Sequence, residues 1–130
     1  AISAKKVILC GQTETPPNTR IKKASINTTE WVSWEYQENS LLAIEKLREE
    51  VPNIQIIAVE KNEKSIANTE IDYKLPLALI VGNETTGVSK EVLKNCDYIA
   101  EIPMFGVNTS LNVIISLAVV AFEAAKQSKS

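Results

Sequence analysis

The chain alternates between short apolar runs and polar connections, and these runs predict its strands. Near-continuous apolar runs at residues 54–59 and 77–81 are typical of strands that are buried on both faces of a parallel sheet. Shorter apolar or β-forming runs predict further strands at residues 7–9, 29–36 and 99–104. The polar stretch at residues 60–74 predicts a connection between two of these strands.

Helices are predicted where apolar positions recur with a helical period behind a capping residue. Residues 41–50 keep much of a 3.6-residue period, and Asn39 or Ser40 can cap their start. Ser89 can cap a short helix at residues 90–96, and a last helix covers residues 111–126. Strands that alternate with helices indicate an α/β fold with a mostly parallel sheet flanked by helices. Because no linker or repeat interrupts the pattern, we expect one domain over residues 1–130.

Composition narrows the possible partners. A chain of 130 residues with 45% hydrophobic residues can bury a core of its own, and its formal charge of -2 gives no overall cationic field for nucleic acid. The longest apolar stretch, residues 113–122, is too short to cross a bilayer, so we expect no membrane association. Cys10 and Cys96 are too few for a disulfide scaffold and lack metal-ligand spacing, which favours a reduced, cytoplasmic setting without a bound metal.

Several kinds of chemistry are excluded by residues that the sequence lacks. It has no histidine, which removes imidazole bases, the usual hydrolase triads and most zinc sites. It also has neither the glycine fingerprint of dinucleotide-binding folds nor the phosphate-cradling loop of nucleotide hydrolases.

The placement of glycine indicates where a ligand can bind. Three of the four glycines, Gly82, Gly87 and Gly106, follow predicted strands, and open parallel sheets bind ligands beyond the carboxyl ends of their strands. Small polar side chains accompany them, namely Asn83, Glu84, Asn108, Thr109, Ser110 and Asn112. The pattern predicts a small polar ligand held largely by backbone groups. Each residue also has a structural explanation, because Gly82 and Gly87 can permit turns, Ser110 can cap a helix and Asn112 can bond a neighbouring loop.

Two sequence motifs carry a family resemblance. "LALIVGNETTGVS", residues 77–89, and "IPMFGVNTSLNV", residues 102–113, resemble the second and third motifs of SpoU-type RNA 2'-O-ribose methyltransferases of the SPOUT superfamily. "VILCGQTETPPNTRIKKA", residues 7–24, is similar to the part that follows the first motif in one branch of that family. The resemblance therefore covers most of the chain.

The resemblance implies a C-terminal trefoil knot, an S-adenosylmethionine cofactor held in the knot loops, and a homodimer. The cofactor-binding residues that it implies are Gly82, Asn83, Gly87, Ile102, Met104, Gly106 and Leu111. The polar active-site positions that it implies are Glu84, Ser110 and Asn112. The expected reaction is methyl transfer to a ribose 2'-hydroxyl of tRNA or rRNA.

The beginning of the chain departs from the family pattern. The first motif, which carries an Asn and an Arg in the family, is not found, and the chain starts at Ala1 rather than at a methionine. We expect that residues upstream have been removed, and that methyl transfer by this chain is absent or very weak without the first motif. The alternative is a non-catalytic dimerisation module of the same fold that binds S-adenosylmethionine or RNA, and an unrelated α/β ligand-binding domain is a third possibility.

Two further features concern partners. Arg20, Lys22 and Lys23 form a local basic patch that can meet RNA phosphate, although a solvated loop has the same composition. In the last helix, residues 111–125 are apolar on nearly every face, so one sheet cannot cover them all. A second copy of the chain would cover the remaining stripe, which predicts a homodimer, unless an upstream segment covers it instead.

Overall fold

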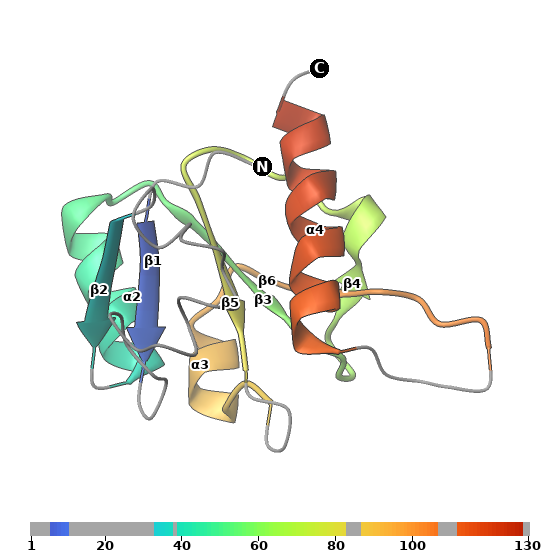
Figure 1. Ribbon diagram of the computed structural model, residues 1–130, viewed down its shortest axis with the longest axis horizontal. Helices are drawn as coiled ribbons and strands as arrows, with labels where there is room; N and C mark the ends of the chain where they lie inside the picture. Colours follow the sequence, from blue (N-terminus) through green and yellow to red (C-terminus); the bar gives the residue numbers. More distant parts are fainter. Residues whose placement is uncertain (1–5, 11–32, 38, 83–86, 107–111, 129–130) are drawn as a thin grey trace, which may run out of the picture. The chain divides into compact units, whose positions relative to one another are not determined.

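The structure is a computed structural model that describes residues 6–10, 33–37, 39–82, 87–106 and 112–128 (Figure 1). The chain divides into two compact units, Ala1–Leu47 and Arg48–Ser130. The candidate site lies in the second unit.

In the first unit, two strands pair in parallel. Strand β1 (Lys6–Cys10) lies beside β2 (Ser33–Gln37) over their full length. These strands confirm the two predicted in this region, although residues 29–32 of the predicted second strand lie outside the described residues. Helix α2 (Ser40–Glu50) begins after Asn39, whose Oδ1 accepts the Leu42 N–H at 2.9 Å, so the predicted cap is confirmed.

The second unit is built on a parallel sheet whose strands are ordered β4-β6-β3-β5. Its members are β3 (Gln55–Val59), β4 (Ile66–Ala67), β5 (Leu77–Val81) and β6 (Tyr98–Glu101). Every pairing among these four strands is parallel. Val59 lies opposite Val81 of β5 and Ala100 of β6, so the carboxyl ends of three strands reach the same edge.

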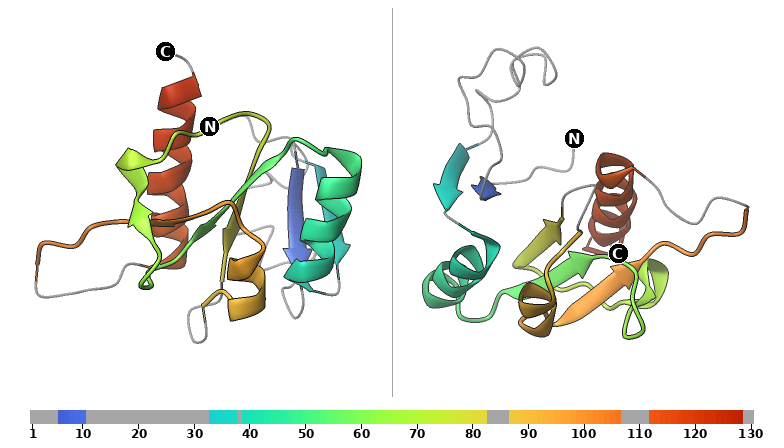
Figure 2. Two further views of the ribbon diagram at one scale, coloured as in Figure 1. Left: turned by 180° about the vertical axis from the view of Figure 1, so that it is seen from behind. Right: turned by 90° about the horizontal axis from the view of Figure 1, so that it is seen from below.

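Helices cover both faces of this sheet, with α4 (Val113–Ser128) on one face and α3 (Lys90–Lys94) on the other (Figure 2). Ser89 caps α3 as predicted, because its side chain accepts the Val92 N–H at 3.3 Å. The predicted α/β fold with a mostly parallel sheet and flanking helices is confirmed. Among the described helices, none is long and apolar enough to span a membrane.

The core forms where α4 meets β3. Ile56, Ile57 and Ala58 have no exposed surface, as expected for a strand that is paired on both sides. The core cluster joins residues of α4 to residues of the sheet and of the segment before β5. It consists of Ile57, Ile71, Tyr73, Ala100, Val120 and Ala124.

Polar contacts fix the C-terminal half of α4 to the segment before β5. The Gln127 amide donates to the Ile71 carbonyl at 3.0 Å and accepts the Tyr73 N–H at 3.2 Å.

The Tyr73 hydroxyl donates to the carbonyl of buried Asn68 at 2.8 Å. Burial, with a smaller contribution from the Glu123 charge, raises the pKa of Tyr73 to about 12, so this hydroxyl stays protonated as a donor.

The opposite, amino-terminal edge of the sheet is held by Arg48 and Asp97. Arg48 Nη2 donates to the Asn95 carbonyl at 2.8 Å and lies 3.5 Å from Asp97 Oδ2, which accepts the Ile56 N–H at 2.7 Å. Burial raises the pKa of the neighbouring Cys96 thiol to about 11, and Asp97 adds to that increase while Arg48 opposes it. The thiol is therefore protonated at neutral pH.

The structure corrects some of the predicted boundaries. The connection predicted at residues 60–74 contains β4 and a short 3-10 helix, η2 (Asn68–Glu70), because an edge strand of two residues is too short to give a periodic pattern. Strand β6 ends at Glu101 rather than residue 104, since Pro103 has no N–H for a strand ladder. Residues 83–86 and 107–111 lie outside the described residues, so the trefoil knot stays a prediction.

Candidate functional site at the carboxyl edge of the sheet

Three connections leave the sheet at its carboxyl edge. Gly82 follows β5, Ile102 follows β6, and Glu60 follows β3, which lies between those two strands. The structure therefore brings the starting points of the two predicted loops to one edge, and it places Glu60 between them. Sequence reasoning missed Glu60 because the order of strands in a sheet cannot be read from their order in the chain.

The loop after β5 closes on itself at Gly82. A Cβ atom at this position would overlap the carbonyl group of Gly87 and the amide nitrogen of Val88. The chain thus returns to the sheet in direct backbone contact with the point where it left. We call this contact of Gly82 with Gly87 and Val88 the neck of the loop. Only glycine fits there without a shift of the backbone, whether or not a ligand is present.

Gly87 is fixed by its backbone angle and by Glu60. Its φ is 68°, in the left-handed region that favours glycine, and a Cβ there would overlap Oε2 of Glu60. That same oxygen accepts the N–H of Val88 at 2.9 Å. Oε1 of Glu60 accepts the Lys61 N–H at 3.1 Å, and the Glu60 N–H donates to the Ala100 carbonyl at 3.0 Å.

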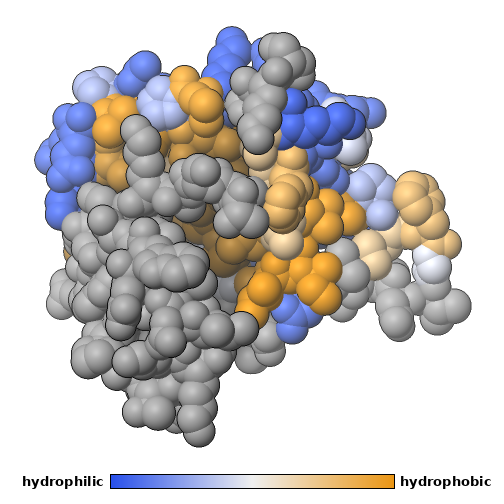
Figure 3. All heavy atoms as spheres, turned by 45° about the horizontal axis from the view of Figure 1, so that its top comes forward, coloured by the Kyte–Doolittle hydropathy of each residue, from blue (hydrophilic) through white to orange (hydrophobic). Residues whose placement is uncertain are grey.

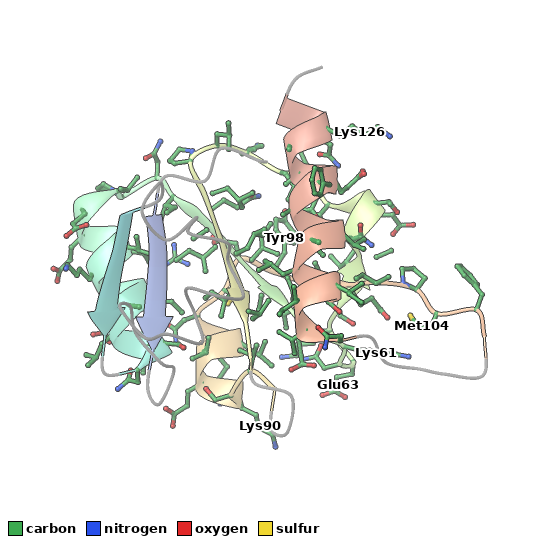
Figure 4. All side chains as sticks on the ribbon, viewed as in Figure 1. Lys61, Glu63, Lys90, Tyr98, Met104 and Lys126 are labelled. Atoms are coloured by element: carbon green, nitrogen blue, oxygen red, sulfur yellow. The ribbon has the colours of Figure 1, made fainter. Side chains whose placement is uncertain are left out.

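The connection after β6 changes from buried to exposed along its length. Ile102 packs against the core cluster, and Met104 is half-buried in the segment that follows (Figure 4). Phe105 is 96% exposed. At Gly106 a Cβ atom would meet no heavy atom of the described residues within 4 Å, so no such contact in this part of the chain explains a glycine there.

Asn112 has a structural role that differs from the predicted bond to a neighbouring loop. Its Oδ1 accepts the Ile114 N–H at 2.8 Å, and its carbonyl oxygen accepts the Ser116 N–H at 2.9 Å, so Asn112 caps α4. Because the side-chain oxygen is used in this cap, Nδ2 is the group that can donate to a ligand.

The other predicted site residues lie outside the part of the chain that the structure describes. They are Asn83, Glu84, Ser110 and Leu111 of the ligand site and Arg20, Lys22 and Lys23 of the basic patch. Their roles stay predictions. Arg48 is held at the opposite edge of the sheet, away from Gly82 and Ile102. Among the described residues, no three acidic, cysteine or histidine side chains form a group that could hold a metal ion.

Comparison with known proteins identifies similar sequences. The sequence profile of the SpoU rRNA Methylase family matches residues 1–122. A tRNA (guanosine(18)-2'-O)-methyltransferase of Aquifex aeolicus is 34% identical in an alignment of 112 positions, which covers 82% of this chain and 52% of the relative. The chain thus spans about half the length of this relative.

Solved structures agree with the observed fold. A TrmH/SpoU tRNA modifying enzyme of A. aeolicus has a TM-score of 0.81 and 28% identity, over 98% of this chain and 64% of that one. An AdoMet-bound rRNA methyltransferase of Sinorhizobium meliloti has a TM-score of 0.85 and 27% identity, over 96% of this chain and 47% of that one.

We expect alanine substitutions at Gly82 and Gly106 to differ sharply. Gly82→Ala forces a methyl group into the backbone of Gly87 and Val88 and should lower the free energy of unfolding by about 1–3 kcal/mol. Gly106→Ala has open space and should change it by less than about 0.5 kcal/mol. Urea unfolding followed by circular dichroism measures both values. Equal losses in the two variants would contradict the described neck at Gly82.

Proposed function

The chain belongs to the SpoU rRNA methylase family, and we propose that it is an S-adenosylmethionine-dependent methyltransferase acting on a ribose 2'-hydroxyl of tRNA or rRNA. The observation that carries the proposal is the family match over residues 1–122, which includes both glycine loops. The similarity to a tRNA 2'-O-methyltransferase over 82% of the chain supports the same reaction.

The carboxyl edge fits the proposed cofactor. Backbone groups at the starts of two loops, at Gly82 and Ile102, lie at one edge of the sheet, and Gly106 follows Ile102 in the second of these loops. We assign cofactor binding to Gly82, Asn83, Gly87, Ile102, Met104, Gly106 and Leu111. When bound, S-adenosylmethionine supplies an electrophilic methyl group.

The remaining task of the chain is to position the ribose and to take up its proton. A positioned hydroxyl reacts far faster than one that diffuses freely, and removal of its proton makes it a better nucleophile. We assign these tasks to Glu84, Ser110 and Asn112, with the carboxylate of Glu84 as an acceptor. Asn112 can contribute its Nδ2 donor, because its oxygen caps α4. A carboxylate can accept this proton, so the proposed reaction has a proton acceptor without histidine.

Binding of RNA would draw on the basic patch of Arg20, Lys22 and Lys23, which offers the positive charge that phosphate requires. We propose a cytoplasmic location, which agrees with the few cysteines and the free Cys96 thiol. The alternative is a non-catalytic module of the same fold that binds the cofactor or RNA without transferring a methyl group.

We expect the chain to bind S-adenosylhomocysteine, the demethylated form of the cofactor, in isothermal calorimetry. Gly106→Val should weaken this affinity about tenfold or more, because its side chain would fill the open space at the site. Gly106→Ala provides a smaller step in the same direction, and circular dichroism checks that both variants are folded. Absence of heat for the parent chain at millimolar ligand would contradict the proposed cofactor.

We expect any methyl label that the protein transfers from S-adenosylmethionine to unmodified tRNA or rRNA to lie on the ribose. A 2'-O-methyl group blocks the attack of the 2'-oxygen on the neighbouring phosphate, so alkaline hydrolysis should release the label in dinucleotides rather than mononucleotides. Label in mononucleotides would indicate base methylation and contradict the proposed reaction. Cofactor binding without transfer to either RNA would favour the non-catalytic alternative.

We also propose a homodimer, on the basis of an exposed apolar stripe along α4. Ile115, Val119 and Phe122 are 52%, 39% and 56% exposed, on the side of the helix away from buried Val120 and Ala124, and Ile114 adds to the stripe with 75% exposure. Figure 3 shows apolar surface in the region of this helix. Soluble proteins rarely leave such a patch uncovered, and a second copy can cover it with the same face.

We expect size exclusion with light scattering to give twice the chain mass of 14.3 kDa. Phe122→Glu places a charge in the stripe and should shift the protein to the monomer mass. Leu75→Glu, a change of another exposed apolar side chain outside α4, serves as the control and should leave the dimer intact. A parent chain at 14.3 kDa at every micromolar concentration would contradict the dimer.

A further inference from the structure

We propose that Glu60 is a positioning residue that holds the described end of the glycine loop, Gly87 and Val88, in the position that cofactor binding requires. This inference rests on the proposed function, because it concerns the same edge of the sheet. Glu60 lies outside both motifs that indicate the cofactor site, and it reaches the glycine loop from a different strand.

The contacts of Glu60 join the ends of three strands. Its own N–H donates to the carbonyl of Ala100 in β6 at 3.0 Å, and it directly follows β3. Its Oε2 accepts the Val88 N–H at 2.9 Å, at the end of the loop that follows β5. A carboxylate that accepts a backbone N–H forms a stronger hydrogen bond than a neutral acceptor. Glu60 therefore links the base of the glycine loop to the two neighbouring strands.

Removal of the carboxylate would leave the loop end without this support. Val88 is buried, with 9% of its surface exposed, and its N–H would lose the acceptor that the structure provides. Gly82 contacts Gly87 and Val88 through the backbone, whereas Glu60 contacts the same two residues through its carboxylate. If Gly87 and Val88 sampled several positions, binding would weaken in proportion to the fraction of molecules in the competent position.

Three variants test this role through their affinity for S-adenosylhomocysteine in calorimetry. Glu60→Ala should weaken binding about tenfold because the loop must then be ordered on binding. Glu60→Gln keeps an oxygen that can accept the Val88 N–H, so it should recover most of the affinity. Glu63→Ala removes an exposed carboxylate from the same connection and should bind as the parent does (Figure 4). Thermal unfolding of each variant checks that the fold is retained.

A second measurement examines the loop without any ligand. Hydrogen exchange of the Val88 amide, followed by nuclear magnetic resonance, should become about tenfold faster in Glu60→Ala, while amides in the centre of β3 keep the parent rate. A purely global loss of stability would accelerate both sets of amides together. Recovery of slow exchange at Val88 in Glu60→Gln would support the hydrogen bond as the cause.

The outcomes separate this inference from the proposed function. If the parent chain binds and Glu60→Ala binds equally well, Glu60 has no positioning role, whereas the proposed cofactor stands. If the parent chain does not bind, the proposed cofactor fails and the positioning role fails with it. Weaker binding together with faster exchange at Val88 alone supports the inference, and uniform acceleration of all amides overturns it.

Discussion

The parallel pairing of β3 on both of its edges is the constraint on which the candidate site depends. Val59, the last residue of this strand, lies level with Val81 on one side and Ala100 on the other. In a parallel sheet, this register brings the following residues to one edge whatever their distance along the chain. The strand can take the central position because Ile56, Ile57 and Ala58 are buried on both faces. A shift in this pairing would separate the loops after β5 and β6.

The glycines of the site are present for different physical reasons. Gly82 is required by close contact between backbones, and Gly87 by its positive φ and by the Glu60 carboxylate. Both requirements exist without a ligand, so these two residues alone are weak indicators of cofactor binding. Gly106 meets no neighbour among the described residues that would exclude a side chain, so close contact does not account for a glycine there.

Much of the fold was predictable because its signals are local. Apolar runs predicted β3 and β5, and capping side chains at Asn39 and Ser89 predicted where two helices begin. The order of the strands was not predictable from such signals, since it depends on pairings between distant segments. The role of Glu60 was missed for the same reason, because its partner Val88 lies 28 positions away.

The candidate site and the exposed stripe are joined through one helix. Asn112 caps the first turn of α4, where the connection from Ile102 enters the helix, and the stripe begins in the same turn at Ile114. On its other face, α4 packs on the sheet at Val120 and is bonded through Gln127 to the segment before β5. A partner that covered the stripe would therefore act on a helix that is held firmly near its C-terminal end. Such a partner would also contact Ile114 in the turn that Asn112 caps, and would therefore lie next to a predicted site residue.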